Sequence, residues 1–439
     1  MKKFLFLLLA PFVAFSCEKV DVTPAAEVED PRDLLDLQDV AKILSSVCLE
    51  PGHLTEVHDA VSSSSGNGYD EEYTMKNLFS SPGTGVGEES QQSEGGQTKG
   101  GKPEGDRSGR YSHPLRDALT DYLSSMAKSR PVTKGGKEVT AEDYIEFMSS
   151  SDMQVYWPYS DGWDGETMPV ITFDPMSEVS SNVGYVMAAD GTLEEVNVTE
   201  EMARQRPVWV INRNDDAGYV SLEKMRRDNP EWSQGGSLVI GGGTGSGTRS
   251  GTGGGTGSKA GSGAGTKVPY KVGAAPVGAP SDDCKTLVLK DFTMLRQYDC
   301  WLAGASEFFC KIGAVESFTA STEAEMYLYN PSITDFMVVL KRDQVGIAHE
   351  LNTVLVSEWT GQFDSAAFLL TEDDGGTITT WACTAMVKCN SKSYGFEIKI
   401  PFNSRDDIVW RGMLSRKYIE SSSTVTGHFG DVVLTFEIK

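Results

Sequence analysis

Five carboxylates are gathered in two short stretches of the last third of the chain. The stretch "YDCWLAGASEFF" contains Asp299 and Glu307, and "LLTEDDGGT" contains Glu372, Asp373 and Asp374. Calcium takes about six to eight oxygens, which flexible loops supply as carboxylates and backbone carbonyls. An Asp-Asp-Gly-Gly turn offers both kinds of oxygen, although Asp-Gly is also the ordinary choice for a solvated hairpin turn. The sequence therefore predicts a calcium site at these five residues, with a solvated turn as the alternative.

The other reactive side chains lack the spacing that catalysis or zinc binding needs. The stretch "HLTEVH" is not H-E-x-x-H, and on a helix His53 and His58 point to different sides, so the two imidazoles cannot share one metal. There is no G-x-S-x-G motif and no Cys/His cluster with ligand spacing. Asp406 and Asp407 are adjacent, and we interpret them as a solvated turn. The pattern favours a binding or structural protein over an enzyme.

The start of the chain carries a motif for acylation of a thiol. Lys2 and Lys3 precede an apolar run over residues 4–15. This run is too short to cross a bilayer, since a spanning helix needs about 20 residues. The following "AFSC" resembles the lipobox of bacterial lipoproteins, in which the cysteine is lipidated and becomes the mature N-terminus. We therefore predict a lipoprotein signal peptide over 1–17 and lipidation of Cys17, with a cleaved secretory peptide or a buried core segment as the alternatives.

The composition fits an exported protein. The chain has 439 residues, with 39 lysines and arginines against 63 aspartates and glutamates and a formal net charge of -24. Such an excess of negative charge repels phosphate backbones, so nucleic acid is excluded as a partner. The expected location is the cell envelope, at the outer membrane, on either its periplasmic face or the cell surface. A length of this order predicts two or three domains.

In the first half of the chain, the pattern of apolar residues changes from helical to strand-like at residue 151. Residues 18–33 are acidic with two prolines, which is typical of a tether, and 34–150 shows helical periodicity around a disordered insertion at about 80–110. The Pro51–Gly52 pair is expected to end the first helix. From residue 151 to 234, short β-branched and aromatic runs bounded by Asp, Gly and Pro predict a small β module.

A glycine-rich segment over 235–281 separates this module from the last part of the chain. No window reads G-x-G-x-x-G or G-x-x-x-x-G-K-[ST], and no amphipathic helix follows, so a phosphate-binding loop is excluded. The segment is instead predicted to be a flexible linker with a reach of roughly 30 Å. On this interpretation the C-terminal module moves against the rest.

Residues 282–439 show regular short strands with polar turns. In "FEIKIPF" the apolar Phe396, Ile398 and Ile400 alternate with charged residues, and "DVVLTFEIK" repeats the pattern. Strands of this kind without helices between them indicate an antiparallel β-sandwich. The predicted fold class is therefore multidomain α+β, with a small helical N-terminal region, a short β module and a C-terminal antiparallel β-sandwich.

The cysteines leave the disulfide pattern open. Cys48 is expected on the apolar face of the first helix. In an extended strand Cys383 and Cys389 lie about 20 Å apart, too far for a disulfide, which needs Cα atoms within about 7 Å. A bridge from Cys310 to either of them and unpaired core thiols are both compatible with the sequence.

Several stretches resemble a known group of proteins. "DMQVYWPYSDGWDGETMPVITFDP", "RPVWVINRNDDAGY" and "WLAGASEFFCKIG" with "LLTEDDGG" are similar to parts of uncharacterised Bacteroidetes cell-envelope lipoproteins. These share a helical N-terminal part, a short β segment and a C-terminal sandwich, which here is similar in outline to C2-like β-sandwiches with calcium ligands in their end loops. The resemblance implies a cell-envelope location and this order of domains, and it transfers no catalytic residue.

Together these patterns predict an envelope-anchored lipoprotein that binds or organises other molecules through its sandwich. Its expected partners are the membrane, through the acyl anchor, and a glycan, peptide or protein ligand. Trp157, Tyr159 and Trp163 could form a binding face, with burial as the alternative. The alternative function is a secreted hydrolase, calcium-dependent, whose scattered carboxylates converge in the fold. No cofactor is expected other than calcium.

Overall fold

The computed structural model describes most of the two folded parts of the chain. It covers the backbone of residues 27–28 and residues 34–80, 114–129, 131–134, 137–214, 219–228 and 284–439. The predicted signal peptide with Cys17, most of the tether, nearly all of the 80–110 insertion and the 235–281 linker lie outside the described residues. Within the described stretches, no helix is long and apolar enough to cross a membrane.

The N-terminal helices begin where the sequence offers a cap. Asp36 and Thr140 each accept a hydrogen bond from the backbone three residues on, at the starts of α1 and α5. Pro51 separates the first two helices as expected, but it also starts the second one, because a proline at the first helical position lacks an N–H that would be unpaired there anyway. The helices are α1 (Leu37–Ser46), α2 (Pro51–Gly66), α3 (Met75–Phe79), α4 (Pro114–Ser129), α5 (Ala141–Ser150) and α6 (Glu200–Gln205).

These helices pack on a mixed sheet of six strands. Its order is β2-β5-β9-β6-β7-β8, antiparallel except for the parallel pair β6 and β9. The strands are β2 (Glu72–Thr74), β5 (Met153–Tyr156), β6 (Val170–Phe173), β7 (Ser181–Met187), β8 (Leu193–Thr199) and β9 (Val208–Arg213). A second, small sheet joins β1 (Glu27–Val28), β3 (Thr133–Lys134) and β4 (Lys137–Glu138).

The helical region and the β module form one folded unit. Val40 and Leu44 of α1 share a buried core with Ile171 of β6 and Trp209 of β9. Strand β2, from within the predicted helical region, forms the edge of the six-stranded sheet. The separate predicted domains 34–150 and 151–234 are therefore a single unit up to residue 214, which we call the N-terminal module.

The C-terminal module is a β-sandwich, as the alternation predicts. One sheet has the order β13-β10-β19-β18, and the other β12-β11-β14-β15-β16 with β17 also paired to β14. Val432, Leu434 and Phe436 of β19 point into the core between the sheets. The strands are β10 (Lys285–Met294), β11 (Ser306–Ala314), β12 (Ser332–Leu340), β13 (His349–Trp359), β14 (Phe363–Glu372), β15 (Ile378–Cys389), β16 (Lys392–Asn403), β17 (Asp407–Ser415), β18 (Thr424–Phe429) and β19 (Val432–Ile438). Two short helices, α8 (Glu323–Met326) and α9 (Arg416–Ile419), lie between strands.

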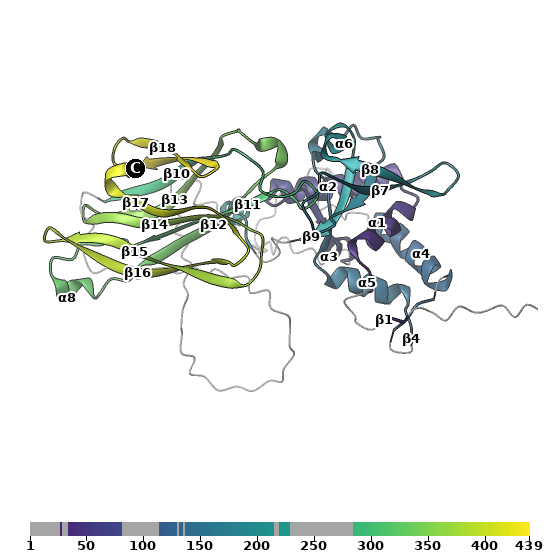
Figure 1. The fold of residues 1–439 in the computed structure, drawn as a ribbon, viewed down its shortest axis with the longest axis horizontal. Coiled ribbons are helices and arrows are strands. Elements are labelled where there is room, and N and C mark those ends of the chain that lie inside the picture. Colours follow the sequence, from purple (N-terminus) through teal and green to yellow (C-terminus); the bar gives the residue numbers. More distant parts are fainter. Residues whose placement is uncertain are drawn as a thin grey trace, which may run out of the picture.

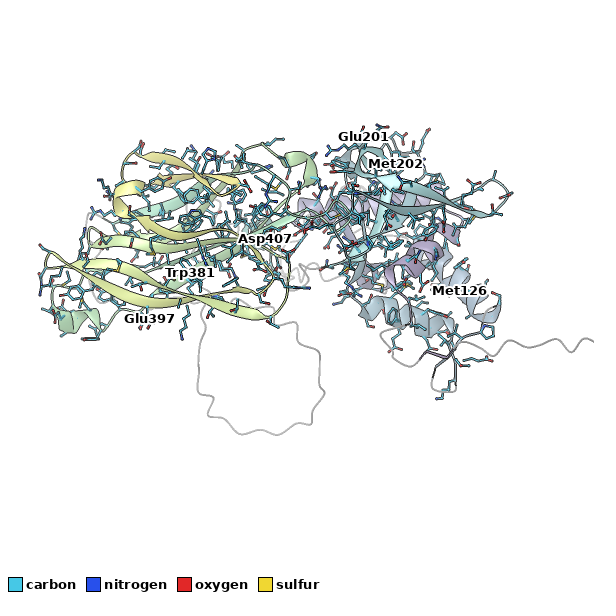
Figure 2. The ribbon with its side chains drawn as sticks, viewed as in Figure 1. Met126, Glu201, Met202, Trp381, Glu397 and Asp407 are labelled. Atoms are coloured by element: carbon cyan, nitrogen blue, oxygen red, sulfur yellow. The ribbon has the colours of Figure 1, made fainter. Side chains whose placement is uncertain are left out.

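A long hairpin adds a third layer to the sandwich. Ile398 and Ile400 of β16 pack with Ala367 and Leu369 of β14 in a second core. The alternate residues of β14, including Phe368, face the first core, so this strand is buried on both sides. The hairpin of β15 and β16, which carries Trp381 and Glu397, runs along the side of the sandwich (Figures 1 and 2).

The two modules are in direct contact, contrary to the expectation of an independently moving sandwich (Figure 1). Trp301 and Leu302, from the sandwich, share a buried core with Val208 and Val210 of the N-terminal sheet. Cys300 Sγ donates a weak hydrogen bond to Val179 O at 3.3 Å. Contacts of this kind bury apolar surface, which holds the modules in one arrangement.

The segment after residue 218 belongs to the sandwich and not to the predicted β module. Leu222 of α7 (Leu222–Asp228) is fully buried in the main sandwich core, and the ring of Tyr219 lies 4.6 Å from that of Phe309. Arg226 Nη2 donates to Thr353 Oγ1 of β13 at 2.7 Å. The described residues 219–228 therefore pack with the sandwich, so the boundary between the modules lies earlier in the chain than the expected 234.

The cysteines of the described residues are unpaired. Cys310 lies in the main sandwich core and Cys389 in the second core, on opposite sides of the sheet, so the bridge left open by the sequence is not formed. Cys48 lies beyond the end of α1 and is exposed, contrary to the expectation of a core position.

Candidate metal centre

Strand pairing brings the two acidic stretches to the same end of the sandwich. Strands β11 and β14 are antiparallel neighbours, with Phe308 opposite Glu372. Asp373 N donates a hydrogen bond to Glu307 O at 3.0 Å. Because antiparallel neighbours place the start of one strand beside the end of the other, the loop before β11 meets the loop after β14. This end faces the N-terminal module, as the position of Asp407 in Figure 2 shows.

The loop after β14 owes its shape to two glycines. Gly375 has a φ angle of 68° and Gly376 one of 106°. Both angles lie in the left-handed region, which side chains with a Cβ rarely adopt. Gly375 N donates to Asp373 Oδ1 at 3.0 Å, which closes the turn. The turn holds Asp373 and Asp374 at fixed positions beside the end of β14.

Three of the five predicted ligands come together. Asp299, Glu372 and Asp374 each place one carboxylate oxygen within 4.8 Å of the others. Calcium–oxygen distances of about 2.3–2.6 Å allow two ligands of one ion to lie up to about 5 Å apart, so the three oxygens fit around one ion. We call these residues the carboxylate trio.

The other two predicted ligands do not join the trio. Successive residues of a strand point to opposite faces, so Glu307 and Asp373 lie on the face opposite to Phe308 and Glu372. Asp373 Oδ1 accepts from Asn403 Nδ2 at 2.7 Å, and Glu307 is buried. The prediction of one five-residue site is therefore wrong, because strand alternation divides the set.

The carboxyl of Asp299 has a strongly raised pKa. Burial raises its pKa to about 6; the charge of Asp374 adds to the rise, while a hydrogen bond with Glu372 and the Arg342 guanidinium oppose it. Asp299 Oδ2 is buried and receives no hydrogen bond from an amide, hydroxyl or cationic group of the described residues. Two neighbouring carboxyls need either a proton or a cation between them, and at neutral pH a cation fits this position.

A second carboxyl pair lies on the opposite face. Burial and a hydrogen bond with Asp373 raise the pKa of Asp406 to about 7, while the charge of Lys311 opposes the rise. Asn403 N donates to Asp406 Oδ2 at 2.9 Å. Asp407 is exposed, but Asp406 is buried, so the interpretation of both as a solvated turn is wrong for Asp406.

Charged groups tie the loop of Asp299 to the N-terminal module. Arg342 Nη1 donates to Asp299 O at 3.1 Å, and its Nε pairs with Glu200 Oε1 of α6 at 3.0 Å. On the same side, Ala305 N donates to Asp70 Oδ2 at 3.2 Å. The trio thus lies beside the contact between the modules, and a bound cation would stabilise the loop that makes this contact.

The sequence offered little sign of Arg342, Glu200 and Asp70, because each is an ordinary charged residue outside any motif. Trp301 and Leu302 carried a signal, since two large apolar residues in an otherwise polar loop predict burial against something.

The other singled-out residues have structural partners. His53 Nδ1 accepts a hydrogen bond from Glu50 N at 2.9 Å, and the His58 ring lies 5.1 Å from that of Trp163. Trp157 is buried, whereas Tyr159 and Trp163 are half-buried, so the expected aromatic face is reduced to the latter two.

Comparison with known proteins finds no matching protein-family model, no matching curated protein and no matching solved structure. The functional conclusion therefore depends on the residues themselves.

Proposed function

We propose that this chain is a lipid-anchored binding protein of a bacterial cell envelope, whose sandwich binds Ca²⁺ at the carboxylate trio, beside the contact between the two modules. The observation that carries the metal proposal is the convergence of Asp299, Glu372 and Asp374 from two loops at the module contact. Calcium would replace the proton that the neighbouring Asp299 and Glu372 carboxyls otherwise need. The resemblance to Bacteroidetes envelope lipoproteins supports the location in the cell envelope, and we propose the outer membrane.

A calorimetric titration tests the calcium proposal. The chain without residues 1–17 is expected to bind one Ca²⁺ per molecule at or below about 1 mM, in the range of extracellular calcium modules. The double variant Asp299→Asn, Asp374→Asn should bind at least about 100-fold more weakly, because two of the three anionic ligands become neutral.

Glu397→Gln is the matched control for this titration, since Glu397 is exposed on β16, far from Asp407 (Figure 2). The control should bind calcium like the unaltered chain. Absence of heat at millimolar calcium, or equal binding by the double variant, would contradict the proposal.

The lipid anchor rests on Cys17, which lies outside the described residues. The variant Cys17→Ala, expressed in a bacterium that processes lipoproteins, is expected to lose palmitate labelling and to move from the detergent phase to the aqueous phase. Alanine has no thiol to acylate, and without the acyl chains the protein loses the anchor, to which each buried methylene contributes about 0.8 kcal/mol. Cys48→Ala, which removes an exposed thiol downstream, should keep its label. An acylated, membrane-bound Cys17→Ala protein would refute the anchor.

A hydrolase finds less support than a binding protein. A glycosidase-type site needs two carboxyls about 5–9 Å apart beside a cleft. Among the described residues, the pocket beside Tyr69 is lined by one carboxylate, Glu223, and the pocket beside Trp163 by one, Asp164. Neither pocket offers the pair that the reaction requires.

A further inference from the structure

A pocket on the N-terminal module lies apart from the carboxylate trio. It has a volume of about 230 Å³ and is formed between the turn after β5 and helix α6. Glu201 and Met202 of α6 lie at the outer edge of the module in Figure 2, so this helix is at the surface. The residues that matter for its chemistry are Trp157, Tyr159, Gly162, Trp163, Arg204 and Arg206.

One side of the pocket is a fixed aromatic wall. The half-buried Trp163 ring rests on the buried Trp157, with the two rings 5.4 Å apart at 62°, and Trp163 Nε1 donates to Thr167 O at 3.1 Å. Tyr159 has a φ angle of 60°, which is strained for a residue with a side chain, and its hydroxyl donates to Glu200 Oε1 at 2.7 Å. Strain of this kind is commonly retained where a binding surface needs it. The aromatic groups are therefore held in place before any ligand arrives.

The other side of the pocket carries two arginines, of which Arg204 is paired with Glu200 Oε1 at 3.1 Å. The Arg204 guanidinium stacks 4.7 Å from the Tyr159 ring, and Arg206 Nη2 donates to Met168 O at 2.8 Å. Arg206 is exposed, and in the described part of the chain no carboxylate lies within ion-pair distance of it.

Asp164, which also lines the pocket, forms no ion pair with Arg204 or Arg206. Its carboxylate accepts hydrogen bonds from Glu166 N, Thr167 N and Thr167 Oγ1, which lower its pKa to about 2. In a chain of net charge -24, an exposed guanidinium with no ion-pair partner among the described residues is suited to bind an anion from solution.

We propose that this pocket binds a small ring that carries a carboxylate. The aromatic wall would pack against the flat face of the ring, and Arg206 would hold the carboxylate by paired N–H donors. The volume is below the range of about 300–1,000 Å³ typical of drug-sized ligands, so the pocket accepts one ring and not an extended chain. A sugar acid and an aromatic carboxylate share this chemistry.

The inference names a ligand class for the binding function proposed above and rests on that function. It involves none of the trio residues. The calcium titration and the ligand titration can therefore fail independently of each other.

Tryptophan fluorescence with glucuronate, benzoate and neutral glucose as probes tests the proposal on the chain without residues 1–17. Glucuronate or benzoate should change the emission saturably at millimolar concentration, and glucose should not. Binding of glucuronate alone identifies a sugar acid, and binding of benzoate alone identifies an aromatic carboxylate. Binding of neither acid, or equal binding of glucose, would overturn the inference.

Two variants test the pocket from different sides. Gly162 lines the pocket and a Cβ added there has no atom within 4 Å, so Gly162→Leu should narrow the pocket without displacing its walls. Arg206→Gln removes the charge at an exposed position. Each should weaken binding at least about tenfold, since a charge-assisted hydrogen bond or the space itself is lost.

Gly361→Leu is the control for the glycine variant, because its Cβ also has open space but lies in the sandwich. It should bind like the unaltered chain. If Gly162→Leu fails to fold, Arg206→Gln still decides the question. Unchanged affinity in a folded Arg206→Gln protein would overturn the proposal.

Discussion

Replacing Leu302 by aspartate is expected to weaken the association of the two modules by at least about 1,000-fold. Leu302 is fully buried against the N-terminal sheet. Truncation of a buried leucine alone costs about 2–5 kcal/mol, and an unpaired buried carboxylate adds several more. A loss above about 4 kcal/mol corresponds to this factor.

The measurement needs a cut at the true boundary. A protease site inserted within 215–218 divides the chain so that α7 stays with the sandwich on which it packs. After cleavage, the unaltered halves should co-elute in size-exclusion chromatography at micromolar concentration, and the Leu302→Asp halves should elute separately.

Leu295→Asp serves as the matched control, since Leu295 lies at the start of the same loop but is 41% exposed. Its halves should remain together. If the Leu302→Asp halves also stay together, the apolar contact does not hold the modules.

In the absence of calcium, the sandwich is expected to become more stable as the pH falls from about 8 to about 5.5. The pKa of Asp406 is raised from 3.8 to about 7, so between these values the folded chain holds a proton that the unfolded chain releases. Stability is therefore lost as pH rises through this window. Asp299, with a pKa raised to about 6, acts in the same direction.

The size of the effect follows from the same pKa values. Each carboxyl contributes about 1.4 kcal/mol per pH unit below its folded pKa, so down to pH 5.5 Asp406 contributes roughly 2 kcal/mol and Asp299 somewhat under 1 kcal/mol. His349 acts in the opposite direction, because burial lowers its pKa and it gains a proton on unfolding as the pH falls. Urea unfolding in the presence of a chelator, followed at both pH values, measures the net result.

Asp406→Asn should remove most of this pH dependence and stabilise the protein at about pH 8. The amide keeps an oxygen that accepts the hydrogen bond of Asn403 N, and it is neutral beside Asp373. Asp407→Asn is the control, since the neighbouring carboxylate is exposed, and it should leave the slope nearly unchanged. An Asp406→Asn protein with the full slope of the unaltered chain would contradict the role of this carboxyl.

Local patterns were sufficient to predict the sandwich. The alternation of Phe396, Ile398 and Ile400 places the last two in a buried core as expected, because side chains alternate with a period of two in any strand. The start of α5 at the Thr140 cap is likewise a local feature, since the cap needs only neighbouring residues. Both signals depend on residues a few positions apart.

The candidate site could be predicted only in part. The sequence by itself determined that acidic loops flank strands of a β-sandwich, and this was enough to point to Asp299, Glu372 and Asp374. Strand alternation alone puts Glu372 and Asp373 on opposite faces, but the face that Glu307 shares depends on the register between β11 and β14. Register is set by pairing between segments that lie far apart in the sequence.

Only the tertiary structure decided how the parts of the chain are combined. The helical region and the β module share one core because β2 pairs with β5, a choice that no local pattern expresses. The burial of Asp406 and the docking of Leu302 likewise depend on which surfaces meet. Periodicity shows which side of an element is apolar, but only the assembled fold decides what covers that side.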